Sequence, residues 1–129
     1  MVMKVLRFGL MALVAVFVAA CSGVPAGLED ANGQSTGSGD HAVTIVNKTG
    51  QAVCYILMSL STDGNWNTDH MSDTQALSND GQFTIRVEAA GEYDIMVLPC
   101  TENPTEEDAL DIEGAFRIEG EVTWTASVK

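Results

Sequence analysis

The feature that most constrains the fold is an alternation of apolar and polar residues that begins after residue 40. The alternation is strict in 83–88, and it recurs in 122–128 and over 43–45. Successive side chains of a β-strand point to opposite faces, so this period of two predicts strands with one buried and one exposed face. Residues 52–60 and 93–98 are apolar on nearly both faces. We therefore expect these two to be central strands and the alternating ones to be more peripheral.

Turn-forming sequences separate these segments at a spacing of about ten residues, which is typical of antiparallel sandwiches and barrels. Each contains glycine beside polar residues, and the pair Asp-Gly supplies the positive φ that hairpins require. The turns are Lys48-Thr49-Gly50, Asp63-Gly64-Asn65, Asn79-Asp80-Gly81, Ala90-Gly91-Glu92 and Glu119-Gly120-Glu121. A weaker strand candidate at 110–118 is interrupted by Gly114, and no convincing amphipathic helix follows residue 21. The pattern predicts an all-β fold, with one small antiparallel β-sandwich over 41–129.

Residues 22–40 differ in composition from the rest of the chain. Gly, Ser, Asn, Pro and acidic residues dominate there, and no periodicity is present. Such sequences behave as flexible coils, so residues 21–40 are expected to form a linker. Nineteen residues of coil would hold the domain about 25 Å from the start of the linker.

The N-terminus has the three-part organisation of an export signal. Residues 1–7 contain Lys4 and Arg7 and no acidic residue, and residues 8–20 are an unbroken run of thirteen apolar or glycine residues. Thirteen is fewer than the roughly twenty apolar residues that span a bilayer. The sequence therefore predicts a signal peptide over 1–20, which is removed from the mature protein.

The residues at the end of this segment resemble the lipobox of bacterial lipoproteins. Val18, Ala19 and Ala20 supply the branched residue and the two small residues that precede the cysteine in that family, and Cys21 follows directly. The resemblance implies lipidation of Cys21 by a diacylglycerol thioether, cleavage before Cys21 and acylation of the new N-terminus, for example with palmitate. It implies anchoring to the cell membrane or outer membrane, with the domain facing the periplasm or the exterior. The alternative is an ordinary signal peptide in which Cys21 is incidental.

The mature chain is strongly acidic. Removal of residues 1–20 leaves four basic residues against all eighteen acidic ones, a formal charge of −14. A field of this sign repels nucleic acid and anionic lipid headgroups, so we expect neither as a partner. The same field attracts cations or basic partners.

The cysteine count fits an exported protein. If Cys21 carries lipid, Cys54 and Cys100 remain as an even pair in an oxidising compartment, which predicts a disulfide. Closure of the loop between them would stabilise the domain by about 4 kcal/mol. Two free thiols or a metal-binding pair are the alternatives, and neither has a neighbouring histidine or further cysteine to support it.

Cys54, Trp66 and Cys100 stand in an order that resembles the immunoglobulin fold, in which a tryptophan packs on a disulfide between the two sheets. The tyrosine that this family has two residues before the second cysteine is replaced by Leu98. We therefore expect an immunoglobulin-like architecture without family membership. Residues 91–97 also resemble the Gly-x-Tyr-Asp strand of many small extracytoplasmic bacterial β-domains.

The strongest candidate for a ligand site is the loop 63–69. Oxygen-bearing side chains occupy its alternate positions, a spacing at which a curled loop directs oxygens at one Ca²⁺. They are Asp63, Asn65, Asn67 and Asp69. The EF-hand pattern fails at Thr68, where glycine is needed, so a plain hairpin loop is the alternative. Trp66 is a candidate for stacking on a sugar or peptide, or for packing on the disulfide.

Other polar clusters are weaker candidates. Residues 102–111 form a second acidic stretch that we expect to be a solvated loop, and His70 lies beside carboxylates at which a transition metal could bind. His41 has no evident partner. The motifs of serine hydrolases, zinc proteases and phosphate-binding loops are absent from the sequence.

These features predict a lipid-anchored cell-envelope protein that is not an enzyme and needs no cofactor. We expect a binding or structural module whose unidentified partner is a protein or a glycan. The alternative is a Ca²⁺- or carbohydrate-binding domain that uses the loop 63–69.

Overall fold

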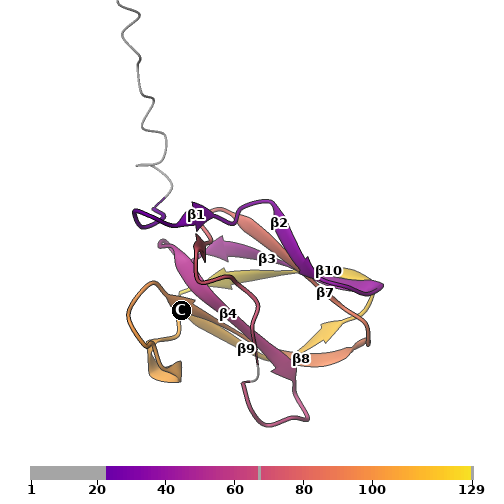
Figure 1. The fold of residues 1–129 in the computed structure, drawn as a ribbon. Helices are drawn as coiled ribbons and strands as arrows, with labels where there is room; N and C mark the ends of the chain where they lie inside the picture. The colour runs from indigo at the N-terminus through magenta and orange to yellow at the C-terminus, as the bar shows by residue number, and fades with distance from the viewer. Residues whose placement is uncertain (1–22, 67, 129) are drawn as a thin grey trace, which may run out of the picture.

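The structure, a computed structural model, describes residues 23–66 and 68–128, which form an all-β sandwich (Figure 1). The predicted signal peptide, Cys21 and Asn67 lie outside the described residues. The strands are β1 (Glu29–Asp30), β2 (Gln34–Gly37), β3 (His41–Lys48), β4 (Val53–Leu60), β5 (Thr68–Asp69), β6 (Gln75–Ala76), β7 (Gln82–Val87), β8 (Gly91–Pro99), β9 (Asp111–Ile118) and β10 (Glu121–Ser127). A 3-10 helix, η2, covers Glu106–Asp108.

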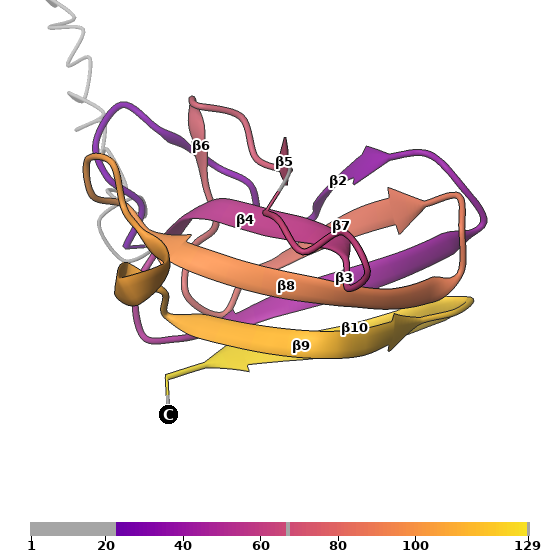
Figure 2. The ribbon, with the colours of Figure 1, turned by 90° about the horizontal axis from the view of Figure 1, so that it is seen from below.

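Two four-stranded sheets make up the sandwich. We call the sheet of order β10-β3-β7-β2 the hydroxyl sheet, after residues described below, and the sheet of order β5-β4-β8-β9 the disulfide sheet. Strands β1 and β6 pair in a separate two-stranded sheet. Figure 2 shows β4, β8 and β9 as curved neighbours, with the chain turning from β9 into β10 and so passing from one sheet to the other.

The core lies between the two sheets and follows the alternation of the sequence. Phe83 and Ile85 of β7 are buried, whereas Thr84 between them is only partly buried. Both large sheets contribute to one apolar cluster, for example through Val43 and Ile45 in β3, Ile56 and Met58 in β4, Ile95 and Val97 in β8, and Trp124 and Ala126 in β10. The predicted strand at 110–118 is confirmed as β9.

The arrangement of the strands differs from the expectation in two ways. The two apolar strands β4 and β8 are central in the disulfide sheet, as predicted, but the alternating strands β3 and β7 are central in the hydroxyl sheet. In addition, β10 pairs with β3 in parallel and β2 pairs with β7 in parallel, so this sheet is mixed. The direction of β10 follows from the connections. The chain reverses from β3 to β4, from β8 to β9 and from β9 to β10, and β8 is antiparallel to β4. As a result, β10 runs in the same direction as β3.

The prediction of a linker extending to residue 40 is wrong for the segment that contains β1 and β2. Ala31 is completely buried, its amide donates to the Ala76 carbonyl (2.9 Å), and β2 pairs along β7. At Gly37, φ is +81°, and a Cβ there would collide with the carbonyl oxygen of Arg86. Glycine is therefore required for a close approach of two strands, whereas the composition alone suggested flexibility.

The Gly-x-Tyr-Asp segment has a structural role at the start of β8. The Tyr93 hydroxyl donates to the carbonyl of Ala89 (2.7 Å), as in the tyrosine corner of immunoglobulin-like sandwiches. The Asp94 carboxylate accepts from the Ala115 amide (2.9 Å) and the Ser61 hydroxyl (2.7 Å), beside a register shift between β8 and β9. These hydrogen bonds lower the pKa of Asp94, the amide contributing most. Both side chains thus stabilise irregular backbone.

Candidate functional site

The predicted disulfide between Cys54 and Cys100 is confirmed. The two residues are 46 positions apart in sequence, with Cα atoms 4.8 Å apart. They lie at the adjoining ends of β4 and β8, two neighbouring strands of the disulfide sheet, where Val53 pairs with Pro99. The bond therefore lies within one sheet, in contrast to the bond between sheets of the immunoglobulin fold.

Trp66 does not pack on this disulfide, so that prediction is wrong. Thr68 in β5 pairs with Met58, and Trp66 precedes it, so Trp66 lies beyond Met58 on the side away from Cys54. The distance along β4 from Cys54 to Met58 alone is about 13 Å. The tryptophan of the core is Trp124 in β10, which is 6 % exposed.

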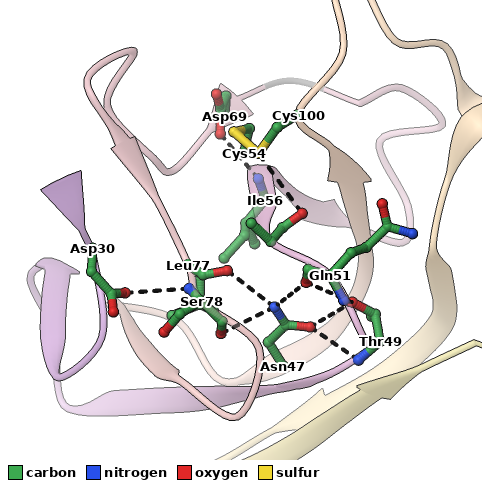
Figure 3. The surroundings of a disulfide bond; sticks show 11 residues. Asp30, Asn47, Thr49, Gln51, Cys54, Ile56, Asp69, Leu77, Ser78 and Cys100 are labelled. Atoms are coloured by element: carbon green, nitrogen blue, oxygen red, sulfur yellow. Dashed lines mark hydrogen bonds between the residues drawn. A yellow bond between two sulfur atoms is a disulfide. The ribbon is translucent and has the colours of Figure 1, made fainter. Parts of the chain in front are cut away.

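A hydrogen-bond network around Asn47 holds the chain that leads into Cys54. Asn47 is completely buried, and its Nδ2 donates to the carbonyls of Gln51 (2.8 Å), Leu77 (3.0 Å) and Ser78 (3.1 Å) (Figure 3). Its Oδ1 accepts from the amide and the hydroxyl of Thr49 (3.1 and 2.7 Å). The side chain thereby joins the turn between β3 and β4 to the segment that precedes β7. Since both ends of the amide are bonded, Asn47 is a structural residue.

The disulfide forms part of the wall of an open groove of about 340 Å³, which we call the disulfide groove. Four segments of the chain contribute to it: the residues before β1, the start of β4, the residues around β6 and the residues after β8. The lining residues are Pro25, Leu28, Cys54, Tyr55, Ser72, Asp73, Gln75, Cys100, Thr101 and Glu102. Its charged side chains, Asp73 and Glu102, are both acidic, so the groove repels anions.

In the loop predicted to bind Ca²⁺, one of the proposed ligands has a structural role. Asp69 accepts from the amides of Ile56 (3.1 Å) and Met71 (3.0 Å) through Oδ1, and it thereby attaches β5 to β4. Burial raises the pKa of Asp69, and these two hydrogen bonds partly oppose the effect. Asp63 and Asn65 are exposed, Trp66 is partly buried, and Asn67 lies outside the described residues. A Ca²⁺ site in this loop stays a prediction.

The two histidines belong to the framework of the domain. The backbone amide of His70 donates to the Ile56 carbonyl (2.8 Å), and burial lowers the pKa of its imidazole. His41 accepts from the Gly120 amide through Nδ1 (2.8 Å). Among residues 23–66 and 68–128, no three His, Cys, Asp or Glu side chains gather in a way that could hold a metal ion.

The acidic stretch 102–111 divides into two parts. Its middle forms η2, whose three residues are exposed, as expected of a solvated loop. Its last residue, Asp111, is buried at the start of β9, and its Oδ2 accepts from the Ser127 amide (2.9 Å) at the end of β10. Asp111 therefore links the two sheets.

A second and larger groove lies on the outer face of the hydroxyl sheet. Its volume is about 510 Å³, and we call it the hydroxyl groove. Gly33 and residues of β2, β3, β7 and β10 line it, most of them polar. The lining residues are Gly33, Gln34, Ser35, Ala42, Thr44, Thr84, Arg86, Glu121, Val122 and Thr123. The groove contains one basic and one acidic side chain. Its own net charge is therefore zero, although the domain as a whole is acidic.

No protein-family model, curated protein or solved structure matches this chain. The candidate sites consequently rest on the geometry of the molecule itself.

The hydroxyl groove is not evident from the sequence. The alternation in β7 and β10 shows which side chains face outward, but the neighbour relations of these strands depend on register and strand order. Thr84 and Thr123 are 39 positions apart in sequence and belong to one row only because β3 lies between them. A row of short hydroxyl side chains at alternating positions was the available signal.

Proposed function

We propose that this protein is a lipid-anchored module of the bacterial cell envelope, exported through its signal peptide, held to a membrane by Cys21, and acting by binding or as a structural component rather than by catalysis. Its domain faces the periplasm or the exterior.

The pairing of the cysteines carries this proposal. The sequence contains three cysteines, and Cys54 and Cys100 are bonded to each other. Cys21 is then the one cysteine without a disulfide partner in the chain, at the position where the lipobox resemblance places the lipid. Disulfides persist in oxidising compartments, which agrees with export. No helix among the described residues is long and apolar enough to cross a membrane.

The N-terminal strands change the geometry of the proposed anchor. Since β1 begins at Glu29, seven residues, 22–28, separate it from Cys21. Seven residues reach at most about 25 Å, and Pro25 in the disulfide groove lies within about 14 Å of Cys21 along the chain. The sandwich is therefore held close to the membrane, with the disulfide groove at its anchored end.

The use of the polar residues supports a role other than catalysis. Asp69, Asp94 and Asp111 accept hydrogen bonds from backbone amides, and the amide side chain of Asn47 is fully bonded. These groups stabilise the fold, whereas the hydroxyl groove presents polar side chains to solvent.

The anchor is tested by fractionation of cells that express the full chain with Cys21→Ser. We expect the wild-type protein in the membrane fraction and the variant in the soluble fraction, with mass spectrometry of the N-terminal peptide showing added acyl mass at Cys21 in the wild type only. The variant Cys54→Ser/Cys100→Ser, which keeps Cys21, is the matched control and should remain with the membrane. Membrane attachment of Cys21→Ser would contradict the proposal.

A further inference from the structure

The outer face of the hydroxyl sheet carries a row of four hydroxyl side chains, one from each strand. Thr123 in β10 is paired with Thr44 in β3, Thr44 with Thr84 in β7, and Thr84 with Ser35 in β2. Paired residues of neighbouring strands point to the same face, so the row runs straight across the sheet. All four residues line the hydroxyl groove.

The adjoining row explains why this face is hollow. There Glu121 is paired with Ala42, and Ala42 with Arg86. The side chains of Arg86 and Glu121 meet above Ala42, with Nη2 and Oε1 3.6 Å apart. Two long charged side chains thus bound one end of the groove, while alanine, threonine and serine form its floor.

The groups in the groove match the chemistry of a sugar. A hydroxyl side chain donates one hydrogen bond and accepts two, so Thr44 and Thr84, bonded to each other at 3.0 Å, keep capacity for a ligand. The guanidinium of Arg86, whose Nη1 donates to the Gly39 carbonyl (3.3 Å), carries further N–H donors for a ligand, and the carboxylate of Glu121 offers paired acceptors. Their ion pair is exposed and long, so it opens at little cost when a ligand competes for it.

Charge and size narrow the class of ligand. The groove holds one cation and one anion on a domain of formal charge −14, which disfavours anionic ligands. Val122 is the one apolar side chain larger than alanine in its lining, which disfavours lipids and apolar peptides. A volume of about 510 Å³ lies within the range of small-molecule sites.

We propose that the hydroxyl groove binds an uncharged oligosaccharide, with Thr44, Thr84, Arg86 and Glu121 as the hydrogen-bonding residues. The inference deepens the proposed binding role and depends on it. It places the sugar on the hydroxyl sheet, on residues other than those of the loop 63–69.

The test uses the mature wild-type protein in a zwitterionic detergent, which avoids sugar headgroups. Maltotriose, cellotriose and triacetylchitotriose are titrated by calorimetry and by ¹H–¹⁵N chemical-shift mapping. We expect at least one of them to give saturable shifts centred on Ser35, Thr44, Thr84 and Thr123. The absence of saturable shifts with all three sugars at about 10 mM would overturn the proposal, as would shifts centred on the loop 63–69.

Variants assign the binding to the groove. Arg86→Gln should weaken the affinity about tenfold or more, because a charged hydrogen bond to the ligand is lost. Thr44→Val/Thr84→Val should also weaken it, and circular dichroism checks its fold. Thr125→Val, a hydroxyl of β10 that does not line the groove, and Trp66→Ala are the matched controls and should bind as the wild type does. Unchanged binding by Arg86→Gln, or loss of binding by Trp66→Ala, would overturn the proposal.

The outcomes separate the two proposals. Sugar binding is measured on purified protein and does not depend on where the lipid is attached. If the titrations fail while Cys21→Ser releases the protein from the membrane, the anchor stands and the sugar site is rejected. If the titrations succeed while Cys21→Ser stays with the membrane, the sugar site stands and the anchor is rejected.

Discussion

In the disulfide sheet three carboxylates accept hydrogen bonds from backbone amides, whereas in the hydroxyl sheet polar side chains of the outer face line an open groove. The difference follows from regularity. Asp69, Asp94 and Asp111 stand at a two-residue strand, a register shift and a strand start, where backbone amides need partners. The ladders β10–β3, β3–β7 and β2–β7 run without a register shift, so the backbone is satisfied by its neighbours. The outward side chains of this sheet are thereby left for other contacts.

The largest effect on stability is expected from loss of the disulfide. Cys54→Ser/Cys100→Ser should lower the free energy of unfolding by about 4 kcal/mol, because the unfolded chain loses a long covalent loop. Denaturant unfolding measures the change. Cys21→Ser, which removes a cysteine outside the pair, is the control and should unfold as the wild type does. A loss below about 1 kcal/mol in the double variant would contradict the role assigned to the disulfide sheet.

Asn47→Ala should cost about 3 kcal/mol of unfolding free energy, because a completely buried side chain and its five hydrogen bonds are lost. Asn79→Ala is the matched control. The Asn79 side chain accepts one hydrogen bond, from the exposed Gly50 amide (2.8 Å). The free energy of unfolding of Asn79→Ala should therefore fall by about 1 kcal/mol or less. Equal losses in the two variants would show that the Asn47 network does not hold this end of the sandwich.

Substitutions in the row of hydroxyl side chains should have little effect on stability. Thr44→Val/Thr84→Val replaces two partly buried side chains by others of similar shape and removes both members of their hydrogen bond, so the free energy of unfolding should change by less than about 1 kcal/mol. Denaturant unfolding of this double variant and of Asn47→Ala measures the two changes in the free energy of unfolding. A loss as large as that of Asn47→Ala would mean that the row of hydroxyl side chains serves the fold rather than a ligand.

A smaller effect is expected from pH. Burial lowers the pKa of His70 in the folded state, so the unfolded chain takes up the proton more readily. The neutral imidazole therefore contributes its full stability at pH values above the pKa of the unfolded chain, about 6.5. This contribution is lost as the pH falls through the lower pKa of the folded state. His70→Gln should flatten the pH dependence of unfolding between about pH 7.5 and 5. If the free energy of unfolding of His70→Gln varied with pH as steeply as that of the wild type, the role of His70 would be contradicted. Asp69 has a raised pKa and acts in the opposite direction, at more acidic pH.

Sequence patterns predicted the regular parts of the molecule well. Strands such as β7 and β10 follow from alternation, which depends only on the residues within one strand. The disulfide follows from counting cysteines. Both inferences use local or compositional information, and the structure confirms them.

What the sequence did not predict depends on relations between distant segments. Gly37 looks like part of a linker until β7 lies beside it and leaves no room for a Cβ. Leu98 stands where immunoglobulin domains have a tyrosine, and the role of Tyr93 depends on the turn after β7, where its hydroxyl donates to the Ala89 carbonyl. Asp69 has the spacing of a cation ligand, yet its oxygen is bonded to the backbone of β4. The hydroxyl groove exists only after four strands are placed in register.

The proposal that the outer face of the hydroxyl sheet presents a sugar site is tested most directly by thermal unfolding with and without the sugar that binds. A ligand that binds only the native state at ten times its Kd stabilises it by about 1.4 kcal/mol. We predict that this sugar raises the Tm of the wild type and of Trp66→Ala, and raises that of Arg86→Gln clearly less. No rise in the wild type, or an equal rise in Arg86→Gln, would contradict the account.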